Sequence, residues 1–302
     1  MTAIQINQLH KAFGDKLILD KVSLDLSENQ IYGFVGPNGA GKTTTIKMIL
    51  GLMTCDSGSI KVFGQKVAFG RTKTNQVIGY LPDVPEFYDY MTASEYLQLC
   101  AGLNQSKHAL HIPYLLQSVG LAENISKIGT FSRGMKQRLG LAQALIHDPK
   151  ILICDEPTSA LDPKGRQDIL EIISSLRGKK TVIFSTHILS DVEKVCDHVL
   201  VLTKHGIYDL DTLREAKAQE NKTTQIKVIV KISDNDAQQL GKTLPVIKKD
   251  NHYQVTLNLA DASQSSQVLE AFYQTLLELK IFPSYLELVD NSLEDLYLEV
   301  IA

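Results

Sequence analysis

A glycine-rich segment near the N-terminus, GPNGAGKTT at residues 36–44, has residue types suited to holding phosphate groups. It follows a short apolar run at residues 30–35 and leads into a segment of helical character that begins at Lys42. Glycines let the backbone curl so that successive N–H groups face one anion, and a helix N-terminus adds a favourable dipole. The pattern therefore predicts a nucleoside triphosphate site.

Each residue of this loop has an expected role. Lys42 is expected to reach the β- and γ-phosphates, and the Thr43 hydroxyl is expected to bind Mg²⁺. The other nucleotide-binding positions are Gly36, Pro37, Asn38, Gly39, Ala40, Gly41 and Thr44. The loop indicates a nucleotide but no purpose, because many classes of enzyme share it. The sequence has no Asn-Lys-x-Asp motif of the kind that reads guanine.

Two adjacent acids close a second apolar run, ILICDEP at residues 151–157. Ligands of α/β sheets bind at the carboxyl ends of the strands, so Asp155 and Glu156 are expected beside the phosphate loop. Asp155 is expected to hold Mg²⁺, and Glu156 to act as general base toward the attacking water. His187 follows a third apolar run and is expected to contact the γ-phosphate or to orient Glu156. A structural histidine is the alternative there.

The elements that must position these residues are short apolar strands that alternate with helical segments. This order predicts an α/β core with a mainly parallel sheet covered on both faces. Residues 1–30 are predicted to form short strands and turns, and a helical subdomain is placed at about residues 90–148.

A polar stretch at residues 215–225 suggests a domain boundary, which gives a core of residues 1–220 and an accessory domain of residues 221–302. Beyond the boundary, apolar residues alternate at 226–232 and 253–259, as in strands, and recur with helical spacing at 268–277. These patterns predict a small α+β appendage with a ferredoxin-like order of elements. They do not indicate its role.

The bulk properties exclude several classes of protein. The net charge is -3 at pH 7, which does not match the basic surface of a nucleic-acid binder. The four cysteines form no CxxC pair, so no zinc site or disulfide framework is expected. No apolar run approaches the roughly 18 residues of a membrane helix, and the N-terminus has no apolar signal core. We therefore expect a cytoplasmic chain whose membrane role comes through a partner.

Further motifs resemble those of the ATP-binding subunits of ABC transporters. FSRGMKQRL at residues 131–139 resembles the family's LSGGQ signature, and SALD at residues 159–162 looks like its D-loop. His187 matches the H-loop, and Phe13 matches the aromatic residue that stacks on adenine. The resemblance covers about residues 4–210. It implies a RecA-like mixed sheet with a β edge subdomain, and ATP and Mg²⁺ as cofactors.

The resemblance also implies partners. In the family the signature faces the γ-phosphate on the opposite subunit, so two cassettes, identical or paralogous, would sandwich two ATP molecules. The residues expected to act in trans are Ser132, Arg133, Gly134 and Met135, with Asp162 in the D-loop. The second implied partner is an integral membrane permease, which would hold the chain peripherally on the inner face of the cell membrane. No nucleic acid is expected.

Two positions depart from the family pattern. Asp83 stands where the family has a glutamine, and Arg133 replaces a signature glycine. Both departures, with the segments at residues 85–97 and 292–300, resemble the exporters of drugs, antibiotic peptides and ions. Asp83 is a further candidate Mg²⁺ ligand, although a carboxylate differs from an amide in charge.

Aromatic residues near Asp83 suggest a contact with the membrane partner. Phe87, Tyr88 and Tyr90 are predicted to line a groove for a short cytoplasmic helix of the permease. The alternative is that they pack the helical subdomain.

Other functions remain open. One is a soluble ABC ATPase that acts without a membrane partner, but such proteins resemble fused cassettes or carry long coiled coils, and neither feature occurs here. The other is an importer motor, for which the glutamine and LSGGQ forms would be expected. The sequence does not encode the transported substrate or the choice between a homodimer and a heterodimer.

Overall fold

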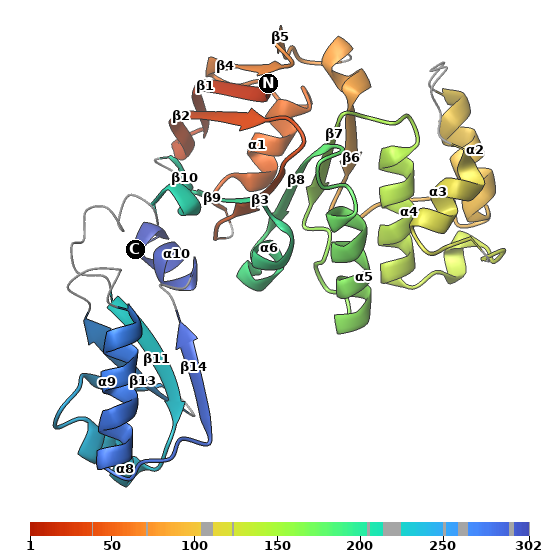
Figure 1. Cartoon of the computed structure of the whole chain (residues 1–302). Helices are drawn as coiled ribbons and strands as arrows, with labels where there is room; N and C mark the ends of the chain where they lie inside the picture. Colours follow the sequence, from red (N-terminus) through yellow and green to blue (C-terminus); the bar gives the residue numbers. More distant parts are fainter. Residues whose placement is uncertain are drawn as a thin grey trace. The chain divides into compact units, whose positions relative to one another are not determined.

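The computed structural model of this 302-residue chain falls into two compact units, the first Met1–Asp209 and the second beginning at Leu210 (Figure 1). The boundary predicted between residues 220 and 221 lies outside the described residues. The structure describes residues 1–37, 39–70, 72–103, 111–122, 124–203, 206–213, 225–249, 252–258, 265–289 and 293–301.

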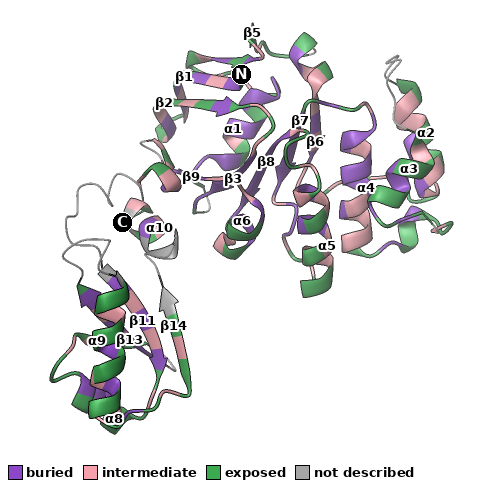
Figure 2. Ribbon diagram, viewed as in Figure 1, coloured by how far each residue is buried: buried purple, intermediate pink, exposed green. Residues whose placement is uncertain are grey.

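A six-stranded sheet forms the centre of the first unit. Its order is β10-β9-β3-β8-β7-β6, with β10 antiparallel and the others parallel. The strands are β10 (Ile207–Asp209), β9 (His198–Leu202), β3 (Ile31–Val35), β8 (Thr181–Thr186), β7 (Ile151–Asp155) and β6 (Ile78–Leu81). Every residue of β3, β7 and β8 is buried, which explains why their sequences do not alternate between apolar and polar residues (Figure 2). The predicted mainly parallel sheet is confirmed.

Helices cover both faces of this sheet. Tyr32 and Phe34 of β3 pack in one apolar core with residues of α1 (Lys42–Ile49). The intervening Gly33 faces α6 (Leu189–Val195), and a Cβ atom there would lie 2.4 Å from Val192 Cγ1. Glycine at this position therefore allows the helix to approach the strand closely. Helix α5 (Pro163–Ser174) lies beside α6.

An antiparallel sheet of order β2-β1-β4-β5 completes the core around α1. Its strands are β1 (Thr2–Phe13), β2 (Lys16–Ser27), β4 (Ser57–Val62) and β5 (Gln65–Lys66). The prediction of short strands in residues 1–30 was wrong, since β1 and β2 each have twelve residues. Register shifts with positive φ at Gln8 (47°) and Lys21 (50°) interrupt the alternation of apolar residues, which hid the length of the strands.

The predicted helical lobe contains α2 (Ala93–Leu103), α3 (Ile112–Ser118) and α4 (Arg133–Leu145). The 3₁₀ turn Ile128–Thr130 precedes α4, and a second 3₁₀ turn, Lys73–Val77, lies outside this lobe, where it leads into β6. Helix α4 lies directly against β6, since a Cβ atom at Gly79 would be 2.1 Å from the Ala144 carbonyl oxygen. Within the described residues, no helix has both the length and the apolar character needed to cross a lipid bilayer.

The second unit has its own apolar core and an antiparallel sheet of order β12-β13-β11-β14. Its chain order is β-α-β-β-α-β, which with this strand order is the ferredoxin-like arrangement. A further helix, α10 (Leu293–Ile301), follows. The elements of the ferredoxin-like arrangement are β11 (Gln225–Lys231), α8 (Asp234–Leu240), β12 (Val246–Lys249), β13 (His252–Asn258), α9 (Ser265–Glu278) and β14 (Tyr285–Val289).

Candidate functional site

The glycine-rich loop connects β3 to α1. Gly39 and Gly41 have φ values of 83° and 101°, in the region that favours glycine. A Cβ atom at Gly41 would also lie 2.9 Å from Ile18 Cγ2, and one at Gly36 would lie 2.7 Å from the Leu202 carbonyl oxygen. The loop can therefore keep this curled path only with glycine at these positions. Ala40 is buried and Pro37 is exposed, whereas Asn38 lies outside the described residues.

The Lys42 ammonium is held inside the loop that it closes. Its side chain is 7% exposed, and Nζ donates a hydrogen bond to the Gly36 carbonyl oxygen at 2.7 Å. Burial lowers the pKa of Lys42, and the carboxylates of Glu156 and Asp155 oppose that shift. The loop therefore presents a partly desolvated cation, which favours a phosphate, beside two carboxylates, which favour a metal ion.

The three threonines that follow Lys42 differ in their surroundings. Thr45 is buried, and its hydroxyl donates to the Gly41 carbonyl oxygen at 2.9 Å, which is a structural role. Thr44 is half-buried, and Thr43 is exposed at the start of α1. Hydroxyl and carboxylate oxygens are the ligands that Mg²⁺ prefers, so Thr43 and the Asp155 carboxylate are chemically suited to this ion.

The two acids at the end of β7 are held by β8. Asp155 is 3% exposed and accepts a hydrogen bond from the Ser185 hydroxyl at 2.6 Å. The same hydroxyl oxygen accepts the Glu156 N–H at 3.0 Å, and the Ser185 carbonyl oxygen lies 3.1 Å from that nitrogen. Glu156 has a φ of 49°, which is rare for a residue other than glycine. Strain of this kind persists where the surrounding structure fixes the backbone, and it occurs often at functional sites.

The Glu156 carboxylate connects the phosphate loop to the histidine after β8. Its Oε1 atom lies 3.7 Å from Lys42 Nζ, and its Oε2 atom lies 3.0 Å from His187 Nδ1. The carboxylate is 16% exposed, whereas His187 is 53% exposed and accessible to solvent. The structure thus brings together three residues that the sequence placed at one edge of the sheet, and of the two contacts expected of His187 it shows the one to Glu156. A carboxylate in this position can accept a proton from water while the imidazole fixes its orientation.

Sequence reasoning missed two neighbours of Asp155. Ser185 pairs with Asp155 in the register of β7 and β8, so a correct alignment of the strands would have revealed it. Tyr80 lies in β6, where burial raises the pKa of its hydroxyl to about 12 and the negative charge of Asp155 adds to the rise. Tyr80 is therefore neutral near the acids, and no short motif marks it.

The signature segment begins helix α4. Ser132 is the N-cap residue, and its hydroxyl oxygen accepts the Met135 N–H at 3.2 Å. Ser132 and Arg133 are exposed, and Gly134 and Met135 are half-buried. A Cβ atom at Gly134 would lie 4.0 Å from Leu161 Cδ2, so the signature and the D-loop are neighbours within one chain.

The two departures from the family pattern contact each other. Arg133 Nη2 lies 3.4 Å from Asp83 Oδ1, and Gln137 donates a hydrogen bond to the Asp83 carbonyl oxygen at 2.6 Å. An ion pair this exposed contributes roughly 0–1 kcal/mol. The Asp83 carboxylate thus faces the signature helix in this structure, and its binding of Mg²⁺ stays a prediction.

The remaining predicted positions are exposed and lie at the ends of a strand and a helix. Phe13 ends β1 and is 48% exposed, with Lys11 Nζ 5.2 Å from the centre of its ring. Asp162 is the exposed N-cap residue of α5, and its side chain makes no capping hydrogen bond to the helix. Both positions are accessible to a ligand or partner.

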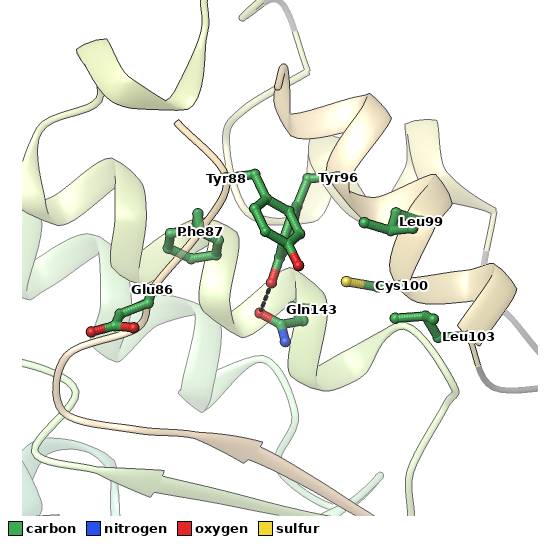
Figure 3. Close-up of a pocket in the computed structure, with 8 residues that line it drawn as sticks. All are labelled: Glu86, Phe87, Tyr88, Tyr96, Leu99, Cys100, Leu103 and Gln143. Atoms are coloured by element: carbon green, nitrogen blue, oxygen red, sulfur yellow. Dashed lines mark hydrogen bonds between the residues drawn. The ribbon is translucent and has the colours of Figure 1, made fainter. Parts of the chain in front are cut away.

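A groove of about 360 Å³ opens beside α2 and α4 (Figure 3). Phe87 packs edge-on against Tyr96 with ring centres 5.1 Å apart, and the Tyr96 hydroxyl donates to Gln143 Oε1 at 3.1 Å. The groove is lined by Glu86, Phe87, Tyr88, Tyr96, Leu99, Cys100, Leu103 and Gln143. Phe87 and Tyr88 therefore line a groove as predicted. Tyr90 is not among the lining residues, although its ring centre lies 5.8 Å from that of Tyr88.

Comparisons with known proteins agree with this geometry. Residues 19–159 match the family model described as ABC transporter. The chain is 39% identical over 302 residues to the uncharacterized ABC transporter ATP-binding protein YxlF of Bacillus subtilis (strain 168), covering 99% of each chain. It is also 41% identical over 204 residues to the bacitracin transport ATP-binding protein BcrA of Bacillus licheniformis, covering 67% of each.

A solved structure is similar to this chain in both fold and sequence. The ATP-binding subunit of an ABC transporter superimposes with a TM-score of 0.62 at 31% sequence identity. The match covers 71% of this chain and 92% of the other. The similarity in fold thus accompanies a similarity in sequence.

Lys42→Ala is expected to raise the dissociation constant for ATP roughly 10- to 100-fold, because a charge-assisted contact with phosphate contributes about 1.5–3 kcal/mol. Calorimetric titration with ATP measures this change. Lys47→Ala is the matched control, since Lys47 is an exposed lysine of the same helix and should leave affinity unchanged. Equal affinity of Lys42→Ala and the unmodified chain would contradict the assignment.

Proposed function

We propose that this chain, which belongs to the family of ABC transporter ATP-binding proteins, hydrolyses ATP to power export through a separate membrane permease. The observation that supports hydrolysis best is the continuous contact from Lys42 through Glu156 to His187. A bound γ-phosphate beside Lys42 would be close to the carboxylate that must activate water. Binding and chemistry would then occur at the same edge of the sheet.

Each residue has a defined part in this mechanism. Glu156 accepts the proton of the attacking water, and His187 holds the carboxylate through its Nδ1 contact. Lys42 offsets negative charge on the β- and γ-phosphates, and Thr43 and Asp155 would hold Mg²⁺. When bound, Mg²⁺ neutralises charge that develops on the phosphate oxygens. Phe13 stacks on the adenine from the end of β1.

A second cassette completes the site. Ser132 and the N–H groups that begin α4 form an exposed anion-binding surface. We propose that this surface meets the γ-phosphate bound to a second copy or a close paralogue. Two ATP molecules then hold the closed dimer together, and hydrolysis of the γ-phosphate releases it.

The groove at Phe87 and Tyr88 is the proposed docking site for the permease. It combines aromatic and aliphatic walls with one acid, Glu86, which suits a short amphipathic helix. Docking would place the chain peripherally on the inner face of the cell membrane. Export is favoured over import because Asp83 and Arg133 replace the residues expected in importers, and because one relative is named for Nod factor export.

Glu156→Gln is expected to retain ATP binding and to lower the hydrolysis rate on the order of 10²–10⁴-fold, because an amide cannot take the proton from water. Phosphate release assays measure the rate, and equilibrium titration measures the binding. Glu193→Gln is the control, since Glu193 is an exposed acid of α6. Unchanged hydrolysis by Glu156→Gln would exclude this residue as the base.

Ser132→Arg is expected to bind ATP with normal affinity but to form no ATP-dependent dimer, since its side chain would occupy the position of the partner's phosphate. Analytical ultracentrifugation of this variant combined with Glu156→Gln would report the dimer. Ser126→Arg places the same side chain at another exposed serine of the helical lobe and should allow dimers to form. Dimers in both variants would rule out the two-cassette site.

Replacing both Phe87 and Tyr88 with alanine is expected to leave ATP affinity unchanged and to lower recovery of the chain with the membrane fraction at least severalfold, because the groove would lose its aromatic walls. Quantitative immunoblotting of membrane and soluble fractions measures this change. Tyr114→Ala is the control, since Tyr114 is 62% exposed on α3 and does not line the groove. Equal membrane recovery of all three proteins would contradict this docking site.

A further inference from the structure

A fully buried carboxylate lies just beyond the candidate site. Asp191 of α6 is 0% exposed, four positions after His187. Its Oδ2 atom accepts the Thr158 hydroxyl at 2.8 Å, and its Oδ1 atom accepts Arg166 Nε at 2.6 Å and Nη2 at 2.5 Å. Arg166 also donates to the Ser190 hydroxyl at 3.1 Å. Both carboxylate oxygens are therefore engaged by side chains from outside α6.

This carboxylate joins three segments of the candidate site. Thr158 lies in the turn that starts at Glu156, where the Ser159 N–H donates to the Glu156 carbonyl oxygen at 3.1 Å. Arg166 lies in the first turns of α5, and its N–H donates to the Asp162 carbonyl oxygen at 2.9 Å. Asp191 itself lies on the helix that follows His187. The cluster thus connects the turn of the proposed base, the start of α5 beside the D-loop, and the segment after the histidine.

The strands do not extend far enough to position the base and the histidine. The paired register of β7 and β8 ends at Asp155 and Ser185, and Glu156 and His187 lie beyond it. The Glu156 N–H still donates to Ser185. Farther from the sheet, the segment after β7 is joined to the segment after β8 by the hydrogen bond from Thr158 to Asp191. The Glu156–His187 contact therefore lies between the end of the sheet and this buried hydrogen bond.

Stability alone gives a poor reason for such a cluster. Moving a carboxylate out of water costs several kcal/mol, and well-packed apolar residues often replace a buried ion pair without loss. Short hydrogen bonds to a buried carboxylate do, however, fix direction as well as distance. A fixed direction is what the strained turn at Glu156 requires.

We infer that Asp191 is a positioning residue that acts through Thr158 and Arg166 to hold Glu156 against His187 and to fix the D-loop beside them. This inference rests on the proposed ATP hydrolysis. The cluster of Asp191, Thr158 and Arg166 is expected to affect the rate of the chemical step. It is not expected to affect nucleotide affinity, since none of the three side chains belongs to the phosphate loop.

The test is the steady-state hydrolysis of ATP by the purified chain carrying Asp191→Asn or Thr158→Val. Each variant is expected to lower kcat roughly 10- to 100-fold, since small misplacements of catalytic groups have effects of this size. KM for ATP should stay within about twofold, because uniform binding is untouched. Thr158→Ser keeps the hydroxyl and is expected to restore kcat. Normal kcat in Thr158→Val would overturn the inference.

A double-mutant comparison separates positioning from general damage. The Glu156–His187 contact is already absent in a His187→Ala variant. Adding Thr158→Val to that variant should therefore lower kcat by less than about twofold. Full additivity of the two losses would overturn the inference. Asp197→Asn is the matched control, since Asp197 pairs with Arg177 and accepts the Ile31 N–H at 2.8 Å. It should lower the unfolding temperature without lowering kcat.

Two further outcomes are distinguishable. If the unmodified chain does not hydrolyse ATP, or if Glu156→Gln is fully active, the proposed function fails and the inference fails with it. If both behave as proposed while Thr158→Val is normal, the inference fails alone. Should Asp191→Asn not fold, Thr158→Val and Thr158→Ser decide the question, because valine is close to threonine in volume and serine retains the hydroxyl.

Discussion

The candidate site depends on the alignment of three parallel strands that end at one edge of the sheet. In this register Val35 of β3 pairs with Thr186 of β8, and Asp155 of β7 pairs with Ser185. The residues that follow these strand ends are Gly36, Glu156 and His187. A shift of one residue in β3 would exchange the side chains that face α1 with those that face α6 and would separate these groups. The complete burial of β3, β7 and β8 thus fixes where the polar groups can meet.

Beyond the strand ends, the polar groups are positioned by short contacts of different strength. Near the sheet these contacts are buried, such as the Ser185 hydroxyl between Asp155 and Glu156. Near the surface they are exposed ion pairs, such as Arg133 with Asp83. Buried hydrogen bonds to charged groups hold geometry firmly, whereas exposed pairs exchange easily with water or another ion. The backbone at Glu156 is therefore held more firmly than the Arg133 side chain.

Much of the first unit could be predicted from the sequence. The glycine-rich loop and the acids after an apolar run require particular residue types at fixed local spacing, and those types are visible in one dimension. The strand lengths of the first 30 residues could not be predicted, because bulges at Gln8 and Lys21 disrupt the alternation on which such a prediction depends. The order of strands and helices along the second unit was suggested by the sequence pattern, whereas the order of the strands within its sheet came from the structure.

The sequence by itself determined where the glycine-rich loop and the two acids lie along the chain and that apolar strands alternate with helices, since backbone conformation and burial act over a few neighbouring residues. Only the tertiary structure decided which distant side chains meet. Glu156 contacts His187, Asp83 contacts Arg133, and Asp191 joins Thr158 to Arg166. Each of these contacts depends on strand register and helix packing, which no local spacing encodes. The tertiary structure likewise shows that Phe87 and Tyr88 line the groove, whereas Tyr90 is not among its lining residues.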